Sequence, residues 1–166
     1  MNKIWGLILA LIFSLNAAFA LSYDYSDTEF VNIPLSPLKP ILSNGDIYEG
    51  QEIQLKVKKN IFCHGCLLVK KGTIATARIE TIVTKGMNGF PAEIIIDNFK
   101  IDGINDSQLM STYYKAGKNF ALLVYPIKWA LTPIPFVGSL TNLIHGTSVR
   151  IDTDDVIVIK YFPHWK

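Results

Sequence analysis

Hydrophobic and polar residues alternate along much of the chain after Gly50, which is the pattern of β-strands with one buried face. Ile53, Leu55 and Val57 alternate with polar neighbours, and residues 73–84 continue as a long run rich in β-branched side chains. Successive side chains of a strand point to opposite faces, so each apolar set falls on one side. The pattern therefore predicts a strand around residues 53–57 and a long strand over residues 73–84.

The second half of the chain carries the same signal in three more places. Residues 91–102 predict a strand, and the slip of the alternation at Asp97-Asn98 predicts a β-bulge there. Residues 147–151 and 155–162 predict two final strands. The polar stretch over residues 103–118 predicts a loop.

Together these strands predict a mainly β fold, either a small antiparallel β-barrel or a sandwich, with one apolar crossover or short helix. Residues 45–166 are expected to form a single β domain. Ahead of it, residues 21–44 contain Pro34, Pro37 and Pro40. Because proline lacks the amide donor that a sheet interior requires, this segment is expected to run over the surface as an extended arm.

The N-terminus has the three parts of a secretory signal peptide. Lys3 supplies a positive charge, residues 4–15 are apolar and uncharged, and Ala18-Phe19-Ala20 is a small-x-small triplet. Residues 1–20 are therefore expected to be removed by cleavage between Ala20 and Leu21. The apolar run is too short to span a bilayer comfortably. The sequence predicts export to the periplasm, the cell surface or the medium.

The order of the elements also carries a resemblance. A short strand ends in Lys70-Lys71-Gly72-Thr73, a long strand follows, Phe99-Lys100-Ile101 lies in the next one, and His145-Gly146-Thr147 opens the last strands after an apolar insert. Over roughly residues 45–162 this layout resembles the exported β-barrel domains of bacterial conjugal-transfer and type IV secretion channel proteins. The resemblance implies a closed antiparallel barrel in the cell envelope. It carries no functional residue over to this chain.

Residues 120–144 are apolar over about the thickness of a membrane, yet they contain Lys128 and three prolines. Because each proline removes a helix hydrogen bond, the favoured interpretation is a strand at residues 120–125, followed by a buried apolar crossover with a short helix near residues 137–144. The alternative is a hairpin that inserts into a membrane or lies on its surface. The candidate residues for contact with a partner or a membrane are Trp129, Leu131, Phe136 and Leu140.

Cys63-His64-Gly65-Cys66 is the sharpest local motif. Two nearby cysteines in an exported chain readily form a disulfide, and the strand-like residues that follow leave no room for the helix that usually stabilises a redox-active thiolate. A structural disulfide between Cys63 and Cys66 is therefore the favoured interpretation. A redox-active pair remains open. A metal site also remains open, although no second pair of ligands completes a set of four.

Charge and the remaining polar residues point to no chemistry. Without Lys3 the 16 basic residues fall to 15 against 14 acidic ones, and a net charge of +1 gives no case for nucleic-acid binding. Asp152, Asp154 and Asp155 are explained as turn-forming residues, and neither His145 nor His164 has a partner at a spacing that indicates catalysis. We expect no catalytic residue, no cofactor and no metal ligand.

The sequence thus predicts an exported cell-envelope protein without enzymatic activity, which binds another envelope protein or assembles with itself. Thiol chemistry or metal binding at Cys63 and Cys66 is one alternative. Peripheral membrane contact through residues 120–144 is the other.

Overall fold

The computed structural model describes residues 30–134 and 137–163. The predicted signal peptide, its cleavage pair Ala20 and Leu21, and the candidate contact residue Phe136 lie outside the described residues.

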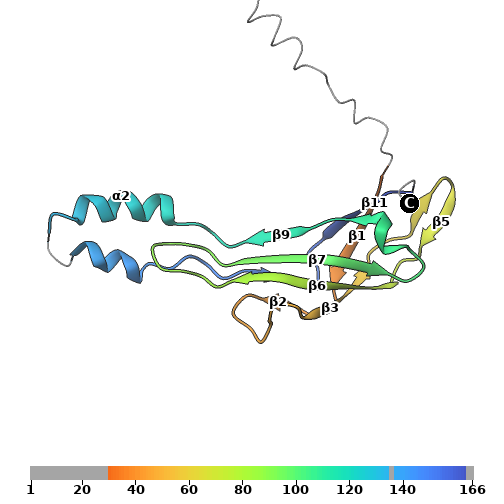
Figure 1. Cartoon of the computed structure of the whole chain (residues 1–166), viewed down its shortest axis with the longest axis horizontal. Coiled ribbons are helices and arrows are strands. Elements are labelled where there is room, and N and C mark those ends of the chain that lie inside the picture. The colour runs from red at the N-terminus through yellow and green to blue at the C-terminus, as the bar shows by residue number, and fades with distance from the viewer. Residues whose placement is uncertain (1–29, 135–136, 164–166) are drawn as a thin grey trace, which may run out of the picture.

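The main element is an antiparallel sheet of seven strands (Figure 1). In spatial order these are β8 (Leu109–Met110), β11 (Ile157–Tyr161), β1 (Val31–Pro37), β3 (Glu52–Val57), β6 (Ile74–Val83), β7 (Glu93–Ile101) and β9 (Tyr113–Ala116). Two short pairings accompany it, β2 (Ile41–Leu42) with β10 (Arg150–Ile151) and β4 (Ile61–Cys63) with β5 (Cys66–Val69). The helical elements are α2 (Ala121–Leu131) and the 3-10 helices η2 (Asp106–Gln108) and η3 (Val137–Leu143).

The sheet curls into a half-barrel. Its two edge strands, β8 and β9, follow one another in the chain with only Ser111 and Thr112 between them, so the two edges are held near each other. An ion pair strengthens this arrangement, because Lys115 on β9 lies 2.7 Å from the carboxylate of Asp155, which precedes β11. The prediction of a mainly β, antiparallel fold is confirmed.

The alternation of the sequence builds the core. On β3 every second side chain is buried, and β11 repeats the pattern. The most deeply buried large side chains of the strands come from β1, β3, β6, β7, β10 and β11: Ile33, Leu35, Leu55, Ile79, Ile94, Ile96, Ile151, Ile157 and Ile159. The apolar face therefore lies inside the curl, and burial of such side chains stabilises the fold by about 1.5–3 kcal/mol each.

The strands predicted over residues 73–84 and 91–102 are confirmed as β6 and β7, and so is the bulge. Between the pairs Thr76–Lys100 and Arg78–Asp97 one residue of β6 faces two of β7, and Asn98 takes a φ of 53°. The extra residue lets β7 bend, as bulges do at the corners of curled sheets.

The expectation that the proline-rich segment runs over the surface is wrong for Val31–Pro37. This stretch is strand β1, which lies between β11 and β3 inside the sheet. The prolines fit because their missing N–H groups fall beyond the neighbouring strands. Pro34 faces Lys58, one residue past the end of β3, and the register places Pro37 opposite Asp155, before β11 begins.

Two further expectations are wrong. The stretch over residues 103–118 is not simply a loop, because it contains the edge strands β8 and β9. Residues 120–125 are not a strand, because they begin helix α2. The side chain of Asn119 accepts a 2.8 Å hydrogen bond from the N–H of Ala121, which favours a helix start. Pro126 lies inside the helix and removes only one of its backbone hydrogen bonds. The short helix expected near residues 137–144 is confirmed as η3.

Candidate functional site

A helical hairpin made of α2 and η3 projects from one end of the elongated sheet, while strand β5 lies at the opposite end (Figure 1). The β6–β7 loop holds the base of this hairpin. Gly89 donates its N–H to the carbonyl of Ile144 at 2.8 Å, and its own carbonyl accepts from the N–H of Phe120 at 2.9 Å. The rings of Phe90 and Tyr125 meet edge to face at 6.2 Å. The hairpin is therefore anchored at its root by backbone hydrogen bonds.

Three polar side chains of the hairpin, those of Lys128, Thr141 and Asn142, lie between its two helices. The ammonium group of Lys128 lies 3.3 Å from the side-chain oxygens of both Asn88 and Asn142. The hydroxyl of Thr141, which is buried, lies 3.4 Å from the same Asn88 oxygen and donates to the carbonyl of Gly138 at 2.8 Å. The β6–β7 loop thus inserts one amide between the two helices, and the only lysine of α2 is occupied inside the hairpin.

Most outward side chains of the hairpin are apolar, and Thr132 and Ser139 are the exposed polar ones. In α2, with 3.6 residues per turn, the exposed positions span an arc of roughly 200°. The strongest exposures are those of Leu122 (88%), Trp129 (73%) and Leu143 (73%). We define the apolar hairpin surface as the exposed large apolar side chains of this region: Met87, Phe90, Phe120, Leu122, Leu123, Tyr125, Ile127, Trp129, Ile134, Leu140, Leu143 and Ile144. Single exposed apolar residues are common on ordinary protein surfaces, whereas a group of this size indicates an interaction site.

The expectation of a buried apolar crossover is therefore wrong. Of the four candidate contact residues, Trp129 and Leu140 are exposed on the apolar hairpin surface, and Leu131 is half-buried. Sequence reasoning missed Leu122 and Leu143, which are among its most exposed members. One sequence signal for an interaction surface was available. Residues 84–92 and 117–148 contain three lysines and no acidic residue.

Lys85 and Lys118 are exposed beside the base of the hairpin. The apolar hairpin surface is thus bordered by positive charge. Residues 84–92 and 117–148, which carry these lysines, contain no acidic residue. Among the described residues, no helix is both long enough and apolar enough to cross a membrane.

Cys63 and Cys66 form the second candidate site, at the tip of the β4–β5 hairpin. They are direct partners across the strand pair, and both carry free thiols. The disulfide predicted between them is absent from the structure. His64 and Gly65 make the two-residue turn with φ angles of 49° and 77°, as a type I′ turn requires. The Cys63 sulfur lies 3.4 Å from Nδ1 of His64.

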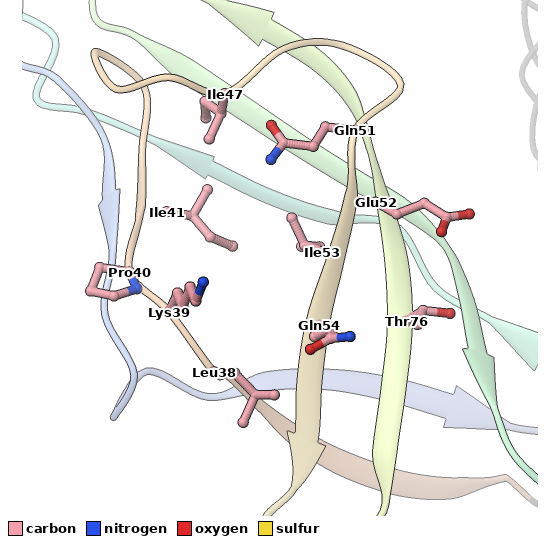
Figure 2. Close-up of a pocket in the computed structure, with 10 residues that line it drawn as sticks. All are labelled: Leu38, Lys39, Pro40, Ile41, Ile47, Gln51, Glu52, Ile53, Gln54 and Thr76. Carbon is pink, nitrogen blue, oxygen red and sulfur yellow. The ribbon is translucent and has the colours of Figure 1, made fainter.

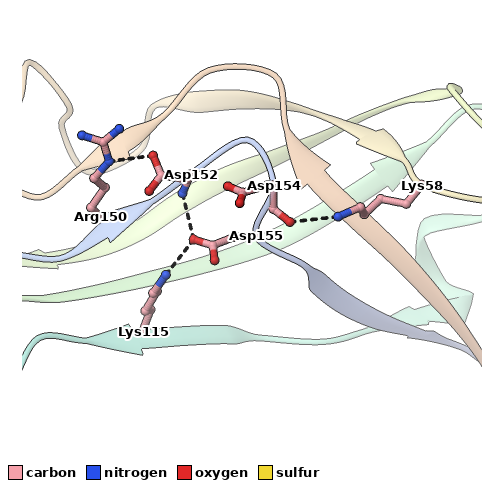
Figure 3. A network of polar contacts seen from close by, with 6 residues as sticks. All are labelled: Lys58, Lys115, Arg150, Asp152, Asp154 and Asp155. Carbon is pink, nitrogen blue, oxygen red and sulfur yellow. Dashed lines mark hydrogen bonds and ion pairs between the residues drawn. The ribbon is translucent and has the colours of Figure 1, made fainter.

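A polar network holds the acidic turn before β11 (Figure 3). Asp155 accepts hydrogen bonds from Lys115 at 2.7 Å and from the N–H of Asp152 at 2.8 Å. These two donors, the Lys115 side chain first, lower the pKa of Asp155 from its ordinary value. Arg150 pairs with Asp152 at 2.6 Å, and Lys58 donates to the carbonyl of Asp154 at 2.8 Å. The turn-forming interpretation accounts for every contact shown.

Within residues 30–134 and 137–163, no group of three or more His, Cys, Asp or Glu side chains is placed to hold a metal ion. His145 lies apart from both cysteines, and its Nδ1 is 2.9 Å from the carbonyl oxygen of Leu143.

A groove of about 570 Å³ opens between β3 and the segment that follows β1 (Figure 2). It begins where the β1–β3 ladder ends, at the 3.0 Å hydrogen bond from the N–H of Leu38 to the carbonyl of Gln54. Its lining mixes apolar and polar side chains: Leu38, Pro40, Ile41, Ile47 and Ile53 with Lys39, Gln51, Glu52, Gln54 and Thr76. This mixture selects no single ligand chemistry, whereas the apolar hairpin surface does.

The fold and the site define a mainly β protein with a curled antiparallel half-barrel and a projecting apolar hairpin. Comparison of the chain with protein-family models, with curated proteins and with solved structures gave no match.

Proposed function

We propose that this protein is a peripheral membrane protein that attaches by inserting the α2–η3 hairpin into one leaflet of a bilayer. The observation that carries the proposal is the inverted polarity of the hairpin. Lys128 of α2 donates on the inside to Asn142 of η3 and to Asn88 of the β6–β7 loop, and the exposed arc of α2 is apolar. A helix that is apolar on its exposed side needs an apolar environment there.

The length of the hairpin suits one leaflet. Helix α2 has 11 residues, which at 1.5 Å per residue gives about 16 Å. The hydrocarbon core of a bilayer is about 30 Å thick, so one leaflet is about 15 Å. Helix α2 is therefore about as long as one leaflet is thick, and η3 packs beside it.

The charge at the root suits the headgroup region. Lys85 and Lys118 are exposed there, and each basic side chain near an anionic leaflet contributes about 1 kcal/mol to binding. Residues 84–92 and 117–148 contain no acidic residue, so an anionic surface would not repel them. We therefore propose a surface that contains anionic lipids.

The proposal includes export. The signal-peptide pattern of residues 1–20 supports a location outside the cytoplasm, in the cell envelope, where the half-barrel would stand off the membrane on its hairpin. The β domain would then be available to other envelope proteins, as the sequence predicts.

The test is flotation of the purified chain with vesicles of phosphatidylcholine alone and with added phosphatidylglycerol. We expect the chain to float with both and more strongly with the anionic vesicles. The fluorescence of Trp129 should shift to shorter wavelength on binding, and Trp129→Phe should remove that shift.

The matched variants are Leu122→Lys with Leu140→Lys on the hairpin, and Ile74→Lys on the sheet, where the side chain is also partly exposed. Charges on the hairpin should abolish flotation, and the charge on the sheet should leave it unchanged. If the wild-type chain floats with neither vesicle and instead self-associates through the hairpin, or requires another protein to cover it, the apolar hairpin surface is a protein interface and the proposal is wrong.

A further inference from the structure

The β4–β5 hairpin carries chemistry that membrane attachment does not use. Its two-residue turn brings Cys63 and Cys66 to directly opposed positions of the two strands. Opposed residues of an antiparallel pair have Cβ atoms about 4.5–5.5 Å apart and point to the same face. A disulfide requires a Cβ separation of about 3.5–4.5 Å, so a small movement joins the two sulfur atoms.

The two thiols differ in their surroundings. Cys63 is half-buried and packs against the core of the sheet, and its sulfur contacts Nδ1 of His64 at 3.4 Å. Cys66 is exposed at the tip. An exchange pair requires this asymmetry, because one sulfur must be reachable by a second molecule while the other completes the reaction from within.

The position of Cys63 and Cys66 also favours a disulfide that is easily reduced. The disulfide would close a loop of only four residues, and the entropic stabilisation that a disulfide provides grows with loop size. It would lie at an exposed hairpin tip, and exposed disulfides are the labile ones. Both features argue against a structural clamp and for a bond in exchange with its surroundings.

We propose that Cys63 and Cys66 form a thiol–disulfide exchange site whose substrates are the disulfides and dithiols of other proteins. In the oxidising direction for this chain, the Cys66 thiol gives its proton to water, and the resulting thiolate attacks one sulfur of a partner disulfide. The partner's other sulfur leaves as a thiolate and takes a proton from water. A mixed disulfide now joins Cys66 to the partner.

Cys63 completes the reaction. Nδ1 of His64, when it carries no proton, takes the proton from the Cys63 sulfur, and the resulting thiolate attacks the sulfur of Cys66. The Cys63–Cys66 bond forms, and the partner's remaining sulfur leaves as a thiolate that takes the proton which Cys63 gave to His64. Two electrons have passed from this chain to the partner, whose disulfide is now a dithiol. The reverse sequence oxidises a partner dithiol.

The site does not depend on the membrane proposal. It lies at the end of the molecule opposite the α2–η3 hairpin (Figure 1). A chain attached by that hairpin would hold the exchange site away from the bilayer.

The experiment uses the reduced chain with oxidised glutathione as the probe, followed by released thiol and intact mass. For the wild type we expect two glutathione thiols released per chain and an internal disulfide. Cys63→Ser should stop at a mixed disulfide on Cys66 with one thiol released. Cys66→Ser should form an adduct about tenfold more slowly, because Cys63 is less accessible. Excess reduced glutathione should return the oxidised wild type to the dithiol.

His64→Asn is the matched control for the turn, because Asn-Gly is the preferred pair for a type I′ turn. It should leave the first step unchanged and slow the second by about tenfold or more, as expected for loss of a general base. An internal disulfide that resists excess reduced glutathione would identify a structural clamp and overturn the proposal. Stable glutathione adducts on the wild type would overturn it as well. Both readouts come from the wild-type chain and stand apart from flotation.

Discussion

Leu122 offers the sharpest test of membrane insertion, because it is the most exposed large apolar side chain of the hairpin at 88%. Leu122→Ala removes three carbon atoms, each worth about 0.8 kcal/mol when transferred from water to an apolar medium. Almost all of this surface is open to water in the unbound chain. The loss is therefore about 2 kcal/mol of transfer free energy, or about 30-fold in the partition coefficient.

The same substitution should barely change folding. An exposed side chain leaves no cavity when it is truncated, so the free energy of unfolding should stay within about 0.5 kcal/mol of the wild-type value. This separates the variant from a core substitution, which would weaken both folding and binding.

The assay is flotation over a series of lipid concentrations, with thermal unfolding of the same samples without lipid. Leu67→Ala is the matched control, since Leu67 is also exposed but lies on β5 at the other end of the molecule. Equal binding by Leu122→Ala and wild type would refute the insertion argument. Equal weakening by Leu67→Ala would show that the effect is not specific to the hairpin.

Four further substitutions test other parts of the structure. Lys128→Met removes the donor shared by two amide oxygens and should destabilise the hairpin by about 1–2 kcal/mol, measured by hydrogen exchange in α2. Gly146→Ala places a Cβ in steric conflict with the carbonyl oxygen of Phe90 and should cost about 2–3 kcal/mol in urea unfolding. Gly50→Ala, whose Cβ meets nothing within 4 Å at a φ of 84°, is its control and should cost about 1 kcal/mol. Asp155→Asn should cost about 0.5 kcal/mol at pH 7, since its ion pair with Lys115 is partly exposed. Because folding lowers the pKa of Asp155, the stabilisation by this ion pair is present above the unfolded pKa of 3.8 and should disappear as the pH falls through the lower folded pKa. A difference in unfolding free energy between wild type and Asp155→Asn that persists below the folded pKa would contradict the assignment.

The sequence alone determined the local structure of most strands. Alternation at period two depends only on neighbouring residues, so β3 could be predicted with its buried face, and β6, β7 and β11 could be predicted as strands. The bulge at Asn98 was also local, because an extra residue shifts the alternation by one. The two-residue turn at His64-Gly65 likewise depends only on neighbouring residues.

Only the tertiary structure decided where each segment lies relative to the others. The prolines of β1 argued against a sheet interior, yet the strand lies in one because the neighbouring strands end where its donors are missing. The apolar run over residues 120–144 had the composition of a core. Its exposure follows from long-range contacts. The side chains of Lys128 and Thr141 bond to Asn88 on the inside of the hairpin, so the apolar side chains of α2 face outward. A sequence records that a side chain is apolar, but the position of its neighbours in space determines whether protein covers it.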